Sequence, residues 1–183
     1  MSVGILILVG TVVALAAFLA FVASRPAEFR IERSIALEAP PSSIFPHVND
    51  LRRWSSWSPW EGMDPALKRA YEGADAGVGA VYHYSGNNKV GEGRMTIRKS
   101  EPSSRVELEL QFLRPFVATN TAVFEFASEG GKTKVTWAME GKNSFAFKLF
   151  GLVFDSEKLV GRDFEKGLAK LKELVESGGN TAA

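Results

Sequence analysis

The chain has 183 residues with 22 Lys and Arg against 21 Asp and Glu, so it lacks the basic excess that nucleic-acid binding requires. It contains no Cys, which excludes disulfides, thiolate catalysis and Cys-ligated metals, and no cluster of carboxylates accompanies its two imidazoles, His47 and His83. We therefore expect no metal, no cofactor and no nucleic-acid partner, and a single domain with an extra segment.

The N-terminal segment is an uninterrupted apolar run over residues 3–23, and the first charge of the chain is Arg25. As a helix, this run would span about 30 Å, the thickness of a bilayer core. A cleaved signal peptide is the alternative, but the run has no basic n-region and is longer than a usual h-region. We predict a single-pass anchor in the cell membrane over residues 1–25. Because Arg25, Arg30 and Arg33 follow the run, the positive-inside rule places the remaining chain in the cytoplasm.

A strand is predicted from about residue 28 to 38, because apolar and polar side chains alternate there. Arg33 is in phase with the apolar side chains, which is unusual for a charge. Either it lies at an end of the sheet beside a carboxylate, or it places a charge at the mouth of a cavity. A short helix to about Leu51 is then expected, capped by Ser42 or Ser43.

Three tryptophans follow this helix at a spacing of three: Trp54, Trp57 and Trp60. Three interpretations remain open for them. They close one end of a sheet, since tryptophan buries a large area. They line the entrance of a lipophilic pocket. They rest at a membrane interface.

The region from residue 67 to 143 alternates between strand and turn patterns. Six strands are predicted, at about 67–73, 79–86, 89–100, 104–113, 117–128 and 132–143. The short turns between them favour an antiparallel meander, in which neighbours in sequence are neighbours in the sheet. Gly77, Gly79, Gly91 and Gly93 lie within or beside these strands, where we expect bulges or bends of a curved sheet.

A final helix is predicted over about residues 154–177, because apolar side chains recur along one stripe of it. The stripe consists of Val160, Phe164, Leu168, Leu171 and Val175. No other long soluble segment is amphipathic, so this helix is expected to cover the apolar face of the sheet. Before it, residues 145–154 are rich in large apolar side chains and form a buried lead-in, a lid over a cavity, or a patch that dips into the membrane. Residues 178–183 are expected to be a disordered tail.

Several motifs in this order carry a family resemblance: Ile31-Glu32-Arg33-Ser34-Ile35, Trp57-Ser58-Pro59-Trp60, Gly77-Val78-Gly79-Ala80, Gly91-Glu92-Gly93-Arg94-Met95, Thr133-Lys134-Val135-Thr136-Trp137 and Gly161-Arg162-Asp163-Phe164. With them the chain resembles the START/Bet v 1-like superfamily, also called SRPBCC or polyketide cyclase/dehydrase-like proteins, and within it a bacterial subgroup with an N-terminal membrane helix. The resemblance implies an α+β helix-grip fold over residues 26–177, in which a curved antiparallel sheet wraps around the C-terminal helix. It also implies a deep apolar cavity that binds lipophilic small molecules.

Catalysis would require a convergent acid/base pair or an activated nucleophile. Asp64, Tyr82, His83, Tyr84 and Glu92 are the candidates, but strand alternation places His83 on the face opposite the two tyrosines. We therefore predict no catalytic residue.

The predicted function is that of a membrane-anchored module that binds or transfers a hydrophobic small molecule or lipid. The candidate ligand-binding residues are large side chains expected to face the cavity: Trp57, Trp60, Tyr82, Tyr84, Met95, Phe112, Phe124, Trp137, Met139 and Phe164. Two alternatives remain, a cyclase or dehydratase-type enzyme acting on an aromatic or polyketide-like substrate, and a protein-interaction module at the membrane.

Overall fold

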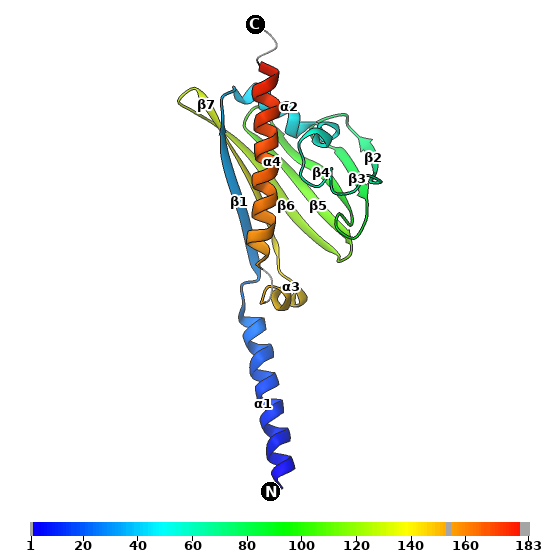
Figure 1. The fold of residues 1–183 in the computed structure, drawn as a ribbon, viewed down its shortest axis with the longest axis vertical. Coiled ribbons are helices and arrows are strands. Elements are labelled where there is room, and N and C mark those ends of the chain that lie inside the picture. Colours follow the sequence, from blue (N-terminus) through cyan, green and yellow to red (C-terminus); the bar gives the residue numbers. More distant parts are fainter. Residues whose placement is uncertain (1, 153–154, 180–183) are drawn as a thin grey trace. The chain divides into compact units, whose positions relative to one another are not determined.

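The computed structural model describes residues 2–152 and 155–179. The elements follow the order α1 (Val3–Ser24), β1 (Glu28–Leu37), α2 (Pro41–Asn49), the 3-10 helix η1 (Leu51–Ser56), β2 (Lys68–Gly73), β3 (Ala80–Ser85), β4 (Glu92–Glu101), β5 (Arg105–Arg114), β6 (Ala118–Glu129), β7 (Lys132–Lys142), α3 (Phe145–Phe150) and α4 (Ser156–Gly179) (Figure 1). The chain divides into two compact units, residues 1–29 with 142–156 and residues 30–141 with 157–183.

The larger unit is built on one seven-stranded antiparallel sheet with the order β1-β7-β6-β5-β4-β3-β2. From β2 to β7 each strand pairs with the next one in the chain, as the meander prediction requires, and β1 lies beside β7. The pairing of β4 with β5 shifts register between Glu92 and Gly93, so one of the predicted glycine bulges is confirmed.

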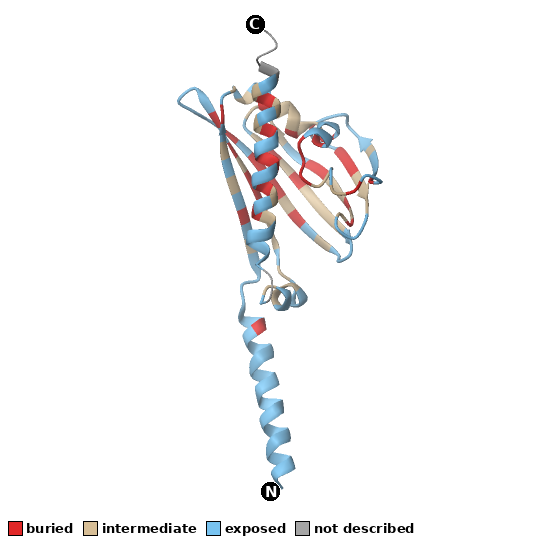
Figure 2. Cartoon of the chain, in the orientation of Figure 1, coloured by how far each residue is buried: buried red, intermediate tan, exposed pale blue. Residues whose placement is uncertain are grey.

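Helix α4 packs along the sheet with its predicted apolar stripe inward (Figure 2). Phe164, Leu168, Leu171 and Val175 are buried, and Val160 is half-buried. Each fully buried side chain of this size contributes roughly 1.5–3 kcal/mol relative to an exposed one. The helix-grip arrangement predicted from the sequence is therefore confirmed. Residues 154 and 180–183 of the predicted helix and tail lie outside the described residues.

The start of α2 differs from the prediction. Pro40 is the N-cap and Pro41 the first helical residue, so a cap by Ser42 or Ser43 is wrong. Proline suits the first helical position because its φ is preset and its missing N–H would have had no helical partner. The side chain of Asp50 instead caps η1 by accepting a hydrogen bond from the backbone N–H of Arg52 at 2.9 Å.

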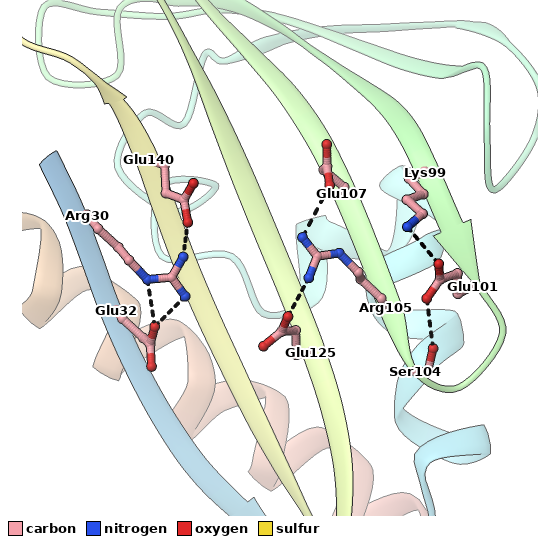
Figure 3. A network of polar contacts seen from close by, with 9 residues as sticks. All are labelled: Arg30, Glu32, Lys99, Glu101, Ser104, Arg105, Glu107, Glu125 and Glu140. Carbon is pink, nitrogen blue, oxygen red and sulfur yellow. Dashed lines mark hydrogen bonds and ion pairs between the residues drawn. The ribbon is translucent and has the colours of Figure 1, made fainter. Parts of the chain in front are cut away.

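The outward face of the sheet is charged (Figure 3). Its ion pairs join Arg30 to Glu32 and Glu140, Arg105 to Glu107 and Glu125, and Lys99 to Glu101. Exposed pairs of this kind contribute about 0–1 kcal/mol each, so their main effect is to keep this face hydrophilic. Most large apolar side chains of the sheet lie on the opposite face, toward α4, although Val81 and Val123 are buried on the outward face.

The smaller unit contains α1, whose 22 residues reach about 33 Å as a helix. Within the described residues it is the one helix long and apolar enough to cross a membrane. In this fully described helix only Val22 is buried, and a signal sequence would meet the same criteria of length and composition. In the same unit, Phe145, Leu149, Phe150 and Leu152 are exposed, so the interpretation of this segment as a buried lead-in is wrong for its described part; residues 153 and 154 lie outside it.

Candidate ligand-binding face

Strand register defines the inner face of the sheet, the face that α4 covers. Cross-strand partners project to the same side. The register therefore groups seven of the predicted residues on this face: Tyr82, Tyr84, Met95, Phe112, Phe124, Trp137 and Met139. Trp57 and Trp60 come from the segment after η1, and Phe164 comes from α4. All ten predicted residues thus belong to the layer around the inner face.

The β6–β7 end of this face is filled by packed rings. Phe164 of α4 stacks on Trp137 with ring centroids 4.1 Å apart and an interplanar angle of 7°. On the sheet, Phe124 stacks on Trp137 at 4.8 Å. A Cβ added at Gly167 would lie 2.9 Å from the Trp137 ring, which shows how closely the helix approaches the sheet. Phe164, Trp137 and Phe124 therefore form a continuous part of the core.

Two of the three clustered tryptophans close this core. Trp54 and Trp57 are buried, and their rings lie 4.8 Å apart. Both indole N–H groups are satisfied, since Trp54 donates to the carbonyl of Val48 at 2.9 Å and Trp57 donates to that of His47 at 3.0 Å. Of the three interpretations of the cluster, closure of the sheet describes these two residues. Trp60 differs because it is half-exposed, with its ring edge against Trp137 at 5.6 Å.

The inner face is more open at one end of β3–β5, whereas Tyr82, Ile97 and Leu108 on the same strands are buried. Tyr84, Met95, Leu110 and Phe112 are only half-buried, whereas Met139 and the ring cluster on β6 and β7 are buried (Figure 2). With Trp60, these residues mark where the inner face becomes accessible to solvent. The predicted site residues thus divide into a buried floor and a half-exposed rim.

Three tyrosines continue the inner face toward the β2 edge. Tyr71 stacks on Tyr82 at 5.1 Å, and Tyr82 lies 5.9 Å from Tyr84. Burial raises the pKa of Tyr84 to about 12. Burial, followed by a hydrogen bond to Glu61, raises the pKa of Tyr82. Both phenols are therefore protonated at physiological pH, and that of Tyr82 donates a hydrogen bond to Glu61.

An ion pair between the buried Glu61 carboxylate and the exposed Arg69 supports this part of the site. Glu61, whose side chain is 7% exposed, accepts a hydrogen bond from the Tyr82 hydroxyl at 2.5 Å and one from Arg69 Nε at 2.6 Å. Because each carboxylate oxygen has a partner, the contacts are those of a structural clamp that holds the loop carrying Trp60 onto β2 and β3. The sequence analysis did not select Glu61 or Arg69, since seven residues lie between them and no motif joins them.

The remaining acid/base candidates do not converge. His83 faces outward, with Nε2 3.2 Å from a carboxylate oxygen of Glu72. The carboxylate of Asp64 accepts hydrogen bonds from the backbone N–H groups of Ala66 and Asn87, so it organises its own loop. Glu92 lies 3.9 Å from Arg114. These groups each have a local partner and share no reaction centre.

Two polar groups on the inner face lack a strong partner within the described part of the chain. The indole Nε1 of Trp137 is buried and has no hydrogen-bond acceptor there. The nearest acceptor of the buried Asn120 amide is the thioether sulfur of Met139 at 3.9 Å, a weak one. An unsatisfied buried donor costs about 1–3 kcal/mol. Asn120 lies opposite the half-buried Leu110 of β5, whereas Trp137 lies within the ring cluster. Asn120 was missed by the sequence analysis, although it is in phase with the apolar residues of β6.

Arg33 forms ion pairs with two carboxylates of helix α4, which account for a charge on the inner side of β1. Arg33 Nε donates to Glu165 at 2.8 Å, and its Nη1 lies 3.3 Å from Glu157. The hydrogen bond to Glu165 raises the pKa of the guanidinium. Of the two interpretations of Arg33, the structure supports the one with a carboxylate partner.

The sheet, the covering helix and the apolar face between them define the class: the chain has the Bet v 1-like helix-grip fold. It is similar to the Aha1 protein of Colwellia psychrerythraea, solved as a dimer, with a TM-score of 0.58, 15% identity and coverage of 81% of this chain and 96% of that one. Protein Ms6760 of Mycobacterium smegmatis matches with a TM-score of 0.57, 16% identity and coverage of 81% and 92%. Ara h 8.0201 matches with a TM-score of 0.58, 11% identity and coverage of 82% and 99%.

The sequence also identifies the family. The model of the family described as "Polyketide cyclase / dehydrase and lipid transport" matches residues 28–176, and the chain belongs to this family. No curated protein matches the chain in sequence. Family membership supports the binding of hydrophobic ligands in general and leaves the particular ligand to experiment.

Proposed function

We propose that the protein is a membrane-anchored module that binds or transfers a hydrophobic small molecule or lipid on the inner face of its sheet. The observation that carries the proposal is the difference in burial on this face between the sealed ring cluster at β6–β7 and the half-buried side chains at one end of β3–β5, which are Tyr84, Met95, Leu110 and Phe112. Half-exposed apolar side chains on a face lined with aromatic rings are what a lipophilic ligand would cover.

Within this proposal the predicted residues take two roles. The rim that the ligand contacts first consists of Trp60, Tyr84, Met95 and Phe112. The floor consists of the buried residues Trp57, Tyr82, Phe124, Trp137, Met139 and Phe164. The amide donor of Asn120, opposite the half-buried Leu110, favours a ligand that carries at least one acceptor oxygen beside its apolar body.

The anchor in this proposal is α1, retained as a single span of the cell membrane. Its length matches a bilayer core, and its side chains are exposed on all sides except at Val22. Arg25, Arg30 and Arg33 after the span favour a cytoplasmic domain by the positive-inside rule. A membrane tether suits a lipophilic cargo, because such a molecule is concentrated in the bilayer.

A pair of variants on opposite faces of β4 tests the site. Met95→Trp adds a large ring to the half-exposed inner face, whereas Arg98→Trp adds the same ring where the side chain is 54% exposed and pairs with Glu109 on the outer face. Titration with a lipophilic fluorescent probe should show at least a tenfold loss of affinity for Met95→Trp and little change for Arg98→Trp. Equal binding by both variants would exclude the inner face as the site.

A protein-interaction module is the second candidate. Such a module is expected to have a filled core and an exposed apolar patch near residues 145–154. The stack of Phe124, Trp137 and Phe164 and the exposed side chains of α3 both favour it. If the purified protein binds no lipophilic probe at all, this candidate replaces the ligand-binding proposal.

A further inference from the structure

Helix α3 is fastened to the C-terminal end of α1 within the smaller unit. The backbone N–H of Asn143 donates to the carbonyl of Ala27 at 2.8 Å. Lys148, in the middle of α3, donates from Nζ to the carbonyl of Ala23 at 2.9 Å. The segment before β1 and the segment after β7 are therefore joined at the end of the apolar helix.

The contact with Lys148 is part of a polar cap on the last turn of α1. The last carbonyl groups of a helix have no helical partner and must be satisfied otherwise. Here the carbonyl of Phe21 accepts from the Ser24 hydroxyl at 2.8 Å, that of Val22 accepts from the N–H of Arg25 at 3.2 Å, and that of Ala23 accepts from Lys148. A charged ammonium group is costly in the hydrocarbon core but stable at its boundary. The cap therefore marks the level at which α1 leaves the bilayer.

At the same level, α3 presents large apolar side chains to the surroundings. Phe145 is 46% exposed, Leu149 is 42% exposed, and Phe150 and Leu152 are exposed as well. Ser144 begins the helix by accepting a hydrogen bond from the N–H of Phe147 at 3.3 Å, so these side chains are held on an ordered turn. A short apolar helix whose lysine points to the end of the membrane span combines the apolar and basic groups typical of a helix in the membrane interface.

We propose that α3, together with Leu152, is a second membrane contact that lies in the interfacial layer of the bilayer where α1 ends. This inference rests on the proposed function, in which α1 is a retained span. A lipid surface is the occupant that the contacts favour, because a segment hydrogen-bonded to the end of a membrane span is surrounded by lipid headgroups and upper acyl chains. Since α3 connects β7 to α4, the chain then returns to the membrane between its last strand and the helix that covers the sheet.

Depth-dependent quenching in the full-length protein tests this contact, and the absence of native Cys allows single-site labelling. An environment-sensitive fluorophore is attached at Leu149→Cys or Phe145→Cys on α3, at Val13→Cys in the middle of α1 and at Ser128→Cys at the exposed end of β6. Each protein is reconstituted in phosphatidylcholine vesicles that carry a nitroxide either at the headgroup or in the middle of the acyl chain.

The proposal predicts that both α3 labels are quenched at least twofold more by the headgroup nitroxide than by the acyl-chain nitroxide. The Val13 label should show the reverse order, and the Ser128 label should be quenched by neither. If the α3 labels behave like the Ser128 label while the Val13 label is quenched, the interfacial contact is refuted and the anchor stands. If the α3 labels are shielded from aqueous iodide yet untouched by both nitroxides, a protein surface covers them and the lipid contact is refuted. If the Val13 label is also unquenched, the anchor and the proposed function's membrane role fail together.

Discussion

The substitution Phe164→Ala examines the contact on which the helix-grip arrangement depends. Phe164 is 1% exposed, stacks on Trp137 at 4.1 Å and meets the edge of Trp60 at 6.2 Å. Removal of the ring leaves a gap between α4 and the sheet that the neighbouring rings cannot close without leaving their own contacts. We therefore expect the full cost of a large-to-small substitution in a core.

The magnitude follows from the burial of the side chain. A buried Phe→Ala change costs about 3–5 kcal/mol, of which ring stacking supplies roughly 0.5–1.5 kcal/mol. Domains of this size are stable by about 5–15 kcal/mol, so the variant should still fold. At roughly 2–4 °C per kcal/mol, the melting temperature should fall by about 6–20 °C.

Urea unfolding followed by tryptophan fluorescence measures this loss, because all four tryptophans of the chain lie in or beside the ring cluster. Leu159→Ala is the matched control on the same helix, since Leu159 is 54% exposed and its truncation should change stability by less than about 0.5 kcal/mol. If Phe164→Ala lowers the free energy of unfolding by less than about 1 kcal/mol and so resembles the control, the packing of α4 on Trp137 is refuted.

Two further predictions concern the polar contacts. Tyr82→Phe should cost about 1.5–3 kcal/mol of unfolding free energy, because it removes the 2.5 Å hydrogen bond to the buried Glu61 carboxylate, whereas Tyr84→Phe, which removes no hydrogen bond to a described residue, should cost less than about 0.5 kcal/mol. Similar losses in the two variants, measured by urea unfolding, would contradict the role of the clamp. Burial, with a smaller contribution from Arg53, lowers the pKa of His47 below its ordinary value of 6.5. The unfolded chain then binds this proton more readily than the folded chain, so the stability contribution is complete above about pH 6.5 and is lost as pH falls through the folded pKa. Between about pH 7.5 and 5.5, His47→Gln should therefore lose less stability than the parent protein, and identical pH profiles would count against the burial of this imidazole.

Much of the fold could be predicted from the sequence because the strands are strictly patterned. The alternation Val106, Leu108, Leu110 and Phe112 fixes the inner face of β5, and the glycine and proline turns fix the strand ends. The apolar stripe of α4 was equally plain, since only one face of that helix is apolar. These features depend on local periodicity, which a single sequence displays directly.

The site was less predictable because it depends on contacts between distant residues. Trp57 and Trp60 follow one spacing, yet one is buried against Phe124 and the other is half-exposed. The clamp of Glu61 and Arg69 forms only when the loop folds back over β2 and β3. The exposure of α3 could not be read from its composition either, because a run of Phe and Leu is apolar whether it faces a core or a membrane.

Identification of a bound lipophile tests the central proposal most directly. The chain from Arg25 onward keeps every strand of the sheet and α4, and this part would be purified without the apolar helix. Extraction of this protein with organic solvent, followed by mass spectrometry against a tag-only control, would show what it carries. The proposal predicts a stoichiometric lipid or aromatic metabolite, or uptake of a lipophilic fluorescent probe that Met95→Trp weakens at least tenfold. A stable, well-folded domain that carries nothing and takes up no probe would contradict the ligand-binding account.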